Sequence, residues 1–540
     1  MSRAGVPEAA LRAPRGAQGT VRRLIVYTLL LVLAVITATG VSGLLGRLLE
    51  GRPDVAGGAG GLALSLAFAL VGGPLWALLW WFLWRQLAGP DRSSAAWGIY
   101  VWVLSIVALI TAATSLLGML AGLLRGDWSP DALATGLTWL AVWVGHRLLW
   151  THPRKGPLRF TTVPPVLGAA YGLVVSAVGA IDALRGVLGA AVLPDLATVG
   201  SPWWLSTLQS LVWAAGGALI WWWHWMRERA VALERTFASV VLVVTGVLGG
   251  SVVALAGLGT ALHVVLRAAF DRAEPWIRLL DPLPLAVAAA AIGAVVWLYH
   301  RRLARERSAS TRSAARLVEA GVGLVFAASG VGVIVNALLA TLASPLAGTG
   351  PRSLLLAGLA ALVVGAPVWW LAWRPLDVAT TGAGATGRRV YLVAVFGASA
   401  VVALVALLVV GFRLFELALD DGSSEGPIER IRAPFGLLLA TVLVAAYHFA
   451  IWRRDRRAAP PEQRTRAIDR VVLVATGDSA ALARAIEAAT GAAVVEWPRA
   501  EAAEGPPTDA VLAALEGVVA RRVLVLAGPG GRVEAVPLSG

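Results

Sequence analysis

The chain has 540 residues, of which 58% are hydrophobic and only 14% are charged, far below the roughly 25% charged usage of soluble domains. This composition argues against a soluble protein, and the lack of cysteine excludes disulfides, thiolate metal sites and cysteine nucleophiles. The formal net charge of +14 raises the question of nucleic-acid binding, but the arginines lie in loops between apolar segments, so we expect a topology signal and no nucleic-acid partner.

Long apolar segments recur along the chain. Each is roughly 20 residues or longer and can cross a hydrocarbon core of about 30 Å. The first is too long for the apolar part of a cleavable signal peptide, so we expect it to be a retained span. The sequence predicts an all-α polytopic membrane protein with twelve transmembrane helices, at 23–46, 62–84, 97–124, 132–150, 163–191, 203–226, 235–269, 283–303, 314–342, 352–373, 388–419 and 433–453.

These segments pair into repeated units, each with two apolar segments, a short turn between them, and aromatic residues and arginine at the end. Such a period predicts a tandem array of one supersecondary unit, here an α-hairpin. The six repeats cover 22–93, 94–157, 158–230, 231–310, 311–385 and 386–457. One position recurs near the end of every second segment, which we call the column: Trp80, His146, His224, His300, Trp373 and His448.

The C-terminal part of the chain changes character. A cytoplasmic tail (1–21) precedes the membrane domain (22–457), and a charged linker (458–468) follows it. Residues 469–540 then alternate short β-rich runs with two helical stretches, in the order βαβαββ. This order predicts a small soluble α/β domain.

Charge placement predicts the topology. Most arginines lie in the N-terminal tail and in the segments that join one hairpin to the next, whereas the turns within hairpins hold fewer. Positive charge stays on the cytoplasmic side of an inserted chain, so both termini are expected to be cytoplasmic. The strong preference for arginine over lysine indicates a GC-rich bacterial genome, and we expect the bacterial inner membrane.

Two interpretations of the column remain open. Tryptophan and histidine near helix ends are typical of an interfacial aromatic belt. If the hairpins close into a ring, the four histidines would instead face a common axis and act as a ligand cage or a proton relay. No carboxylate stands beside any of them in the sequence, so we expect no metal and no cofactor.

Two acidic residues lie inside predicted spans, where an ionisable group is costly unless it is paired or hydrated. Asp182 lies about three turns inside the fifth span, and Glu319 lies one turn into the ninth. Both are candidate functional sites. The alternative is a local ion pair near an interface, Asp182 with Arg185 and Glu319 with Arg316.

The repeat itself resembles a known family. The opening RRLIVYTLLLVLAVITATGVSGLLGRLL, the turn and the aromatic-rich second segment resemble a bacterial domain of unknown function that occurs in tandem in integral membrane proteins. The resemblance covers 22–457 and implies tandem two-helix units in a lipid bilayer. It implies no activity and no catalytic residues.

Two functions remain open. Our working hypothesis is binding or translocation of a small solute or ion through the repeat bundle, which repetition and the intramembrane acids favour. The alternative is a membrane sensor or scaffold without transport activity, whose residues 469–540 dock a cytoplasmic protein partner; the scarcity of polar residues within the spans favours it. The sequence contains no Ser/His/Asp set, HExxH motif or paired carboxylates, so we expect no enzymatic activity.

Overall fold

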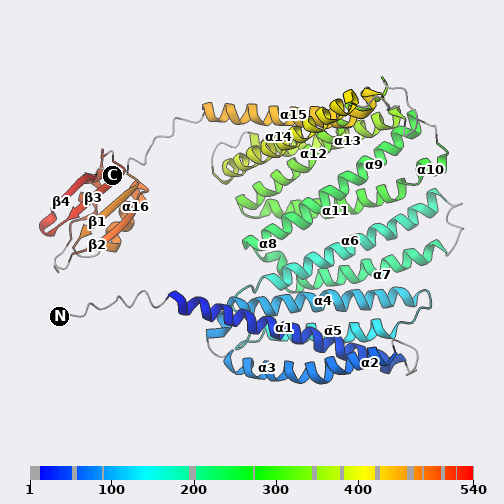
Figure 1. Cartoon of the computed structure of the whole chain (residues 1–540), viewed down its shortest axis with the longest axis horizontal. Coiled ribbons are helices and arrows are strands. Elements are labelled where there is room, and N and C mark those ends of the chain that lie inside the picture. Colours follow the sequence, from blue (N-terminus) through cyan, green and yellow to red (C-terminus); the bar gives the residue numbers. More distant parts are fainter. Residues whose placement is uncertain are drawn as a thin grey trace. The chain divides into compact units, whose positions relative to one another are not determined.

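The helices of a computed structural model of the chain are shown in Figure 1. The structure describes residues 13–50, 58–87, 90–193, 202–271, 274–342, 350–377, 382–419, 426–458, 468–476, 479–499, 505–518 and 520–538. Most of the predicted tail and linker therefore lie outside the described residues. The chain divides into two compact units, Met1–Phe449 and Ala450–Gly540.

The first unit is mostly helical among its described residues, and its last helix continues into the second unit. In chain order its helices are α1 (Ala13–Glu50), α2 (Gly58–Ala67), α3 (Gly73–Gln86), α4 (Ala95–Leu123), α5 (Pro130–Trp150), α6 (Val163–Val192), α7 (Trp203–Trp222), α8 (Thr236–Val241), α9 (Gly250–Phe270), α10 (Trp276–Leu280), α11 (Leu283–Glu306), α12 (Ala309–Ala340), α13 (Pro351–Asp377), α14 (Gly382–Leu419) and α15 (Pro427–Ala458). π-Helical turns join α2 to α3 (Phe68–Gly72), extend α7 (Trp223–Arg227) and join α8 to α9 (Leu242–Gly249).

Ten helical runs among the described residues are long and apolar enough to cross a membrane. They coincide with ten of the twelve predicted spans, so the protein is a polytopic, mostly helical membrane protein. Helices α5 and α7 occupy the other two predicted positions, and both are rich in tryptophan.

Serine residues set where several helices begin. The Ser94 and Ser129 side chains accept hydrogen bonds from Trp97 N and Ala132 N at the starts of α4 and α5, and Ser308 does the same for Thr311 N in α12. A serine oxygen in this position satisfies one of the N–H groups that a helix start leaves unpaired. The helices therefore begin at defined residues.

Glycine allows the paired helices to approach closely. A Cβ at Gly172 of α6 would lie 2.8 Å from the Gly217 oxygen of α7. A Cβ at Gly330 of α12 would likewise lie 2.7 Å from the Gly358 oxygen of α13. Small residues at such contacts let backbones pack where lipid supplies no hydrophobic drive. These glycines hold α6 against α7 and α12 against α13.

Further contacts join each pair of helices to its neighbours. Helix α1 packs on α5, α4 on α6 and α7, α11 on α6, α9 on α13, and α12 on α14. Figure 1 shows the same succession, from the blue α1–α3 through the green α9 and α11 to the yellow α14 and the orange α15. Neighbouring helix pairs therefore contact one another within the bundle.

The second unit contains a four-stranded sheet with the strand order β2-β1-β3-β4. Strands β1 (Arg470–Ala475), β2 (Ala493–Pro498) and β3 (Arg522–Ala527) are parallel, and β4 (Val533–Leu538) runs antiparallel to β3. Helices α16 (Ser479–Thr490) and α17 (Thr508–Leu515) make the crossovers. The predicted small α/β domain is confirmed, with its own core that includes Val471, Leu473, Ile486, Val523 and Val525.

Candidate functional site

The histidines of the column are buried, and each makes the same type of hydrogen bond within its own helix. In each, Nδ1 lies 2.8 Å from the carbonyl oxygen four residues earlier in the same helix. Because a carbonyl only accepts, Nδ1 must carry the hydrogen, and in the neutral ring Nε2 is left as an acceptor. The exposed fractions are 7% for His146, 3% for His224 and His300, and 0% for His448.

His146 belongs to an aromatic cluster with Trp80 and Tyr100. The Tyr100 hydroxyl donates to His146 Nε2 at 3.1 Å, and the ring centroid of Trp80 lies 6.4 Å from that of Tyr100 and 6.5 Å from that of His146. The three rings come from α3, α4 and α5. The histidine acceptor is therefore satisfied inside the bundle.

A matching cluster lies near the other end of the helical unit. The Trp373 ring is 5.1 Å from Tyr391 and 5.9 Å from His448, and the Tyr391 and His448 rings are 5.8 Å apart. Here the Tyr391 hydroxyl and His448 Nε2 are buried and have no hydrogen-bond partner among the described residues. The two clusters share the same three residue types but differ in this one hydrogen bond.

The other two histidines pack against glycine. A Cβ at Gly168 would lie 2.6 Å from His224 Nε2, and a Cβ at Gly246 would lie 2.5 Å from His300 Cβ. The Trp143 ring contacts His224 at 6.0 Å, and the Trp225 ring contacts His300 at 5.9 Å. The column therefore does not converge on one point. Its histidines lie in separate packed clusters, each with its own aromatic neighbours.

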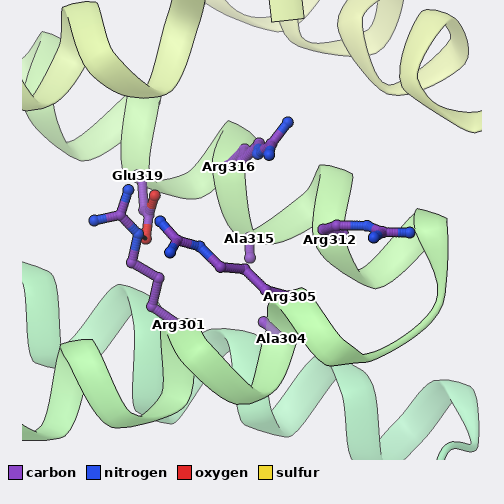
Figure 2. A pocket seen from close by; sticks show the side chains of 7 residues that line it. All are labelled: Arg301, Ala304, Arg305, Arg312, Ala315, Arg316 and Glu319. Carbon is purple, nitrogen blue, oxygen red and sulfur yellow. Dashed lines mark ion pairs between the residues drawn. The ribbon is translucent and has the colours of Figure 1, made fainter. Parts of the chain in front are cut away.

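Glu319 forms a buried ion pair with a neighbouring helix. Its side chain is 2% exposed, and its Oε1 lies 3.0 Å from Arg301 Nε of α11. The Trp297 indole N–H donates to the same oxygen at 3.0 Å. Figure 2 shows the Arg301 guanidinium directly beside the Glu319 carboxylate. Arg316, the partner considered from the sequence, forms no ion pair within the described ranges, because Arg301 approaches from the facing helix.

A second ion pair of the same composition involves Glu228, which the sequence did not single out. Its carboxylate lies 2.5 Å from Arg147 Nε and accepts from the Trp223 indole N–H at 3.1 Å, and its side chain is also 2% exposed. Burial raises the pKa of the Glu228 carboxyl above its usual range, and the nearby Arg147 guanidinium opposes that rise. Glu228 and His224 also line one small hollow, so a carboxylate does accompany one histidine of the column.

Asp182 has a different environment. It lies on α6 with a side chain that is 45% exposed, 3.8 Å from Arg185 Nε, which is 56% exposed. This is the local pair that the sequence offered as the alternative. The structure does not bring Asp182 together with Glu319 or with the histidines in any of the described clusters.

A known family matches the repeated part of the chain. A family model described as a domain of unknown function (DUF5671) matches three tandem stretches of the chain, residues 9–145, 164–278 and 315–443. The chain belongs to this family. Searches among curated proteins and solved structures gave no match. We call the three DUF5671 stretches copies 1, 2 and 3; copies 1 and 3 each cover two of the predicted hairpins.

The copies explain where the buried ion pairs lie. Arg147 follows copy 1 and pairs with Glu228 inside copy 2, and Arg301 follows copy 2 and pairs with Glu319 inside copy 3. We call these two groups, each with its tryptophan, the junction clusters: Arg147, Trp223 and Glu228, and Arg301, Trp297 and Glu319. Both arginines come directly after a column histidine. The recurring His-Arg pair was the sequence signal that could have found them.

No described group of three or more histidine, aspartate or glutamate side chains is arranged to hold a metal ion. The described clusters themselves consist of ion pairs and packed aromatic rings. In both clusters a guanidinium and an indole N–H meet the same carboxylate oxygen at low solvent exposure. These groups are suited to joining the copies.

Proposed function

We propose that this protein is a membrane scaffold or sensor with twelve spans, in which the three copies pack into one helical unit and the α/β domain docks a cytoplasmic partner. It would be neither a transporter nor an enzyme. The observation that carries the proposal is the use of the buried ionisable residues: Glu228 and Glu319 each pair with arginine at a junction. Because each carboxylate has an arginine of another helix as its partner, packing between the copies is enough to account for both buried acids.

Twelve spans follow if α5 and α7 also cross the bilayer. They have 21 and 20 residues, and a 20-residue helix is about 30 Å long. Each packs along a candidate span that precedes it, α5 on α4 and α7 on α6. Their tryptophans suit the interfacial zone. With the arginine bias of the loops, this gives cytoplasmic termini and, in a bacterium, an inner-membrane location.

The α/β domain supports the docking part of the proposal. It has a core of its own and a sheet with mixed strand directions, and it follows the last membrane helix in the chain. Removing residues 458–540 should leave membrane insertion of the helical unit intact while abolishing cross-linking of the full chain to cytoplasmic proteins. Identical cross-linking with and without these residues would contradict docking through this domain.

A second candidate, binding of a small solute or ion, is favoured by the hollow that Ser105, Trp143, Arg147, His224 and Glu228 line between α4, α5, α6 and α7. Polar groups in a mainly apolar hollow are typical of ligand sites. In this candidate the ion pair of the first junction opens to admit the ligand.

Single cysteines distinguish the two candidates, because the natural chain has none. A membrane-impermeant thiol reagent should leave His224→Cys and Glu319→Cys unlabelled in a scaffold and label them from one side in a transporter. Arg125→Cys and Arg154→Cys, both at exposed turns, are the controls. The proposed topology predicts labelling of Arg125→Cys from outside and of Arg154→Cys from inside only.

A further inference from the structure

A hollow at the turn between α11 and α12 is lined by four arginines and one carboxylate. It is lined by Arg301, Ala304, Arg305, Arg312, Ala315, Arg316 and Glu319. Figure 2 shows these side chains on the two facing helices, with the alanines between them. Four guanidinium groups and one carboxylate give the hollow a formal charge of 4 − 1 = +3.

The single acid is already neutralised. Glu319 is held by Arg301 at 3.0 Å and by the Trp297 indole N–H at 3.0 Å. Across the described ranges, Arg305, Arg312 and Arg316 form no ion pair. Arg302, one residue from Arg301, instead pairs with Glu306 outside the hollow at 3.7 Å. Three guanidinium groups without an ion pair therefore line the hollow.

The backbone around the hollow is held in position. Arg307, at the turn itself, donates from both terminal nitrogens to the Leu233 and Val231 carbonyls at 2.8 Å. Ser308 caps the start of α12 through Thr311 N. Arg312 lies in the first turn of this 32-residue helix, where the unpaired N–H groups add partial positive charge. Because the turn is fixed, little ordering is needed before an anion binds.

The depth of the hollow indicates the kind of anion. Helices α11 and α12 belong to candidate spans that end at Glu306 and begin at Ala309. Their junction therefore lies at a membrane boundary, where phospholipid headgroups are found. Planar guanidinium groups match phosphate oxygens and can bind them through two parallel hydrogen bonds.

We propose that this hollow binds a phosphate group, either of an anionic phospholipid or of a soluble phosphate compound, through Arg305, Arg312 and Arg316. The inference goes beyond the proposed function, since a scaffold or a transporter could equally carry such a site. Arg301 and Glu319 keep their junction role.

The test uses the purified full-length chain in a neutral detergent, with phosphatidylglycerol and phosphatidylcholine as probes and native mass spectrometry as the readout. The natural chain should retain phosphatidylglycerol about tenfold more tightly than phosphatidylcholine, the ratio for one charge-assisted contact. The double variant R305Q/R312Q should lose this preference. The matched control R302Q, which removes an arginine of the same helix outside the hollow, should keep it.

Inorganic phosphate separates the two sources. If it binds in the natural chain but not in R305Q/R312Q and displaces phosphatidylglycerol, the ligand is a soluble phosphate. If the phosphatidylglycerol preference persists in its presence and still depends on the two arginines, the ligand is a lipid headgroup. Equal retention of phosphatidylglycerol by the natural chain and R305Q/R312Q, or equal weakening by R302Q, would overturn the proposal. Unchanged thermal unfolding of R305Q/R312Q excludes misfolding as the cause.

Discussion

The residue that follows the column histidine after copies 1 and 2 differs from the one after copy 3. After His146 and His300 comes an arginine that pairs with a glutamate of the following copy, whereas Phe449 follows His448. A repeat array buries its copies against one another and needs a different residue where the array stops. The arginine occurs at both ends that meet a further copy, and the apolar residue occurs where none follows.

The column clusters show the same kind of difference. Tyr100 and His146 form a hydrogen bond in one cluster, while the equivalent atoms of Tyr391 and His448 are buried without a partner. Equivalent residues thus reach different degrees of polar satisfaction in copies 1 and 3. A buried polar atom without a partner costs more than a hydrogen bond gains, so the Tyr391–His448 contact is expected to stabilise the chain less than the Tyr100–His146 contact.

The largest expected effect is at the second junction. Glu319→Ala leaves Arg301 without its carboxylate at a site where the glutamate is 2% exposed, and breaking a buried pair costs about 3 kcal/mol. Thermal unfolding of the detergent-purified chain measures this. The control is Glu306→Ala at the end of α11, where the pair with Arg302 is exposed. Its loss of stability should stay below about 0.5 kcal/mol. Equal shifts for both variants would show that the junction pair does not hold the copies together.

The second largest loss of stability is expected at the first junction cluster. Arg147→Ala and Glu228→Ala should each destabilise the chain, and the double variant should cost less than the sum of the two. Groups in direct contact show coupling energies of about 2 kcal/mol in such cycles. The measurement is the free energy of unfolding of all four proteins. Additive losses would mean that the Arg147–Glu228 pair is incidental.

A smaller effect separates the two column clusters. Tyr100→Phe removes the hydroxyl that donates to His146 Nε2 and should cost about 1 kcal/mol. Tyr391→Phe removes a buried hydroxyl without a partner and should be neutral or stabilising. Thermal unfolding of the two variants side by side provides the comparison. A loss at Tyr391 as large as that at Tyr100 would indicate an unseen partner in the third copy.

The smallest effect is expected at Asp182. Its pair with Arg185 is about half exposed and 3.8 Å long, and such pairs contribute about 0.5 kcal/mol or less. Asp182→Asn should therefore leave the unfolding temperature almost unchanged. A strong change in solute uptake by vesicles containing this variant, with stability intact, would instead support transport and contradict the scaffold.

The sequence predicted the membrane class, the positions of ten candidate spans and the α/β domain because these depend on apolar length and strand pattern, which are local properties. It also aligned His146 and His448 as equivalent. It did not find Glu228, since a glutamate just past a helix end looks like an ordinary loop residue. The partner of Glu319 could not be predicted from the sequence either. Arg301 approaches from another helix, and helix rotation is set by packing rather than by residue spacing.

The π-helical turn Trp223–Arg227 directly precedes Glu228. A π-helical turn holds one residue more than the α-helix it replaces, and each α-helical residue advances the chain by about 100° around the axis. Regular α-helical winding of the same five residues would carry Glu228 further around the helix axis, away from Arg147. The winding of this segment therefore matters as much as its chemistry, because it sets the direction in which Glu228 leaves α7.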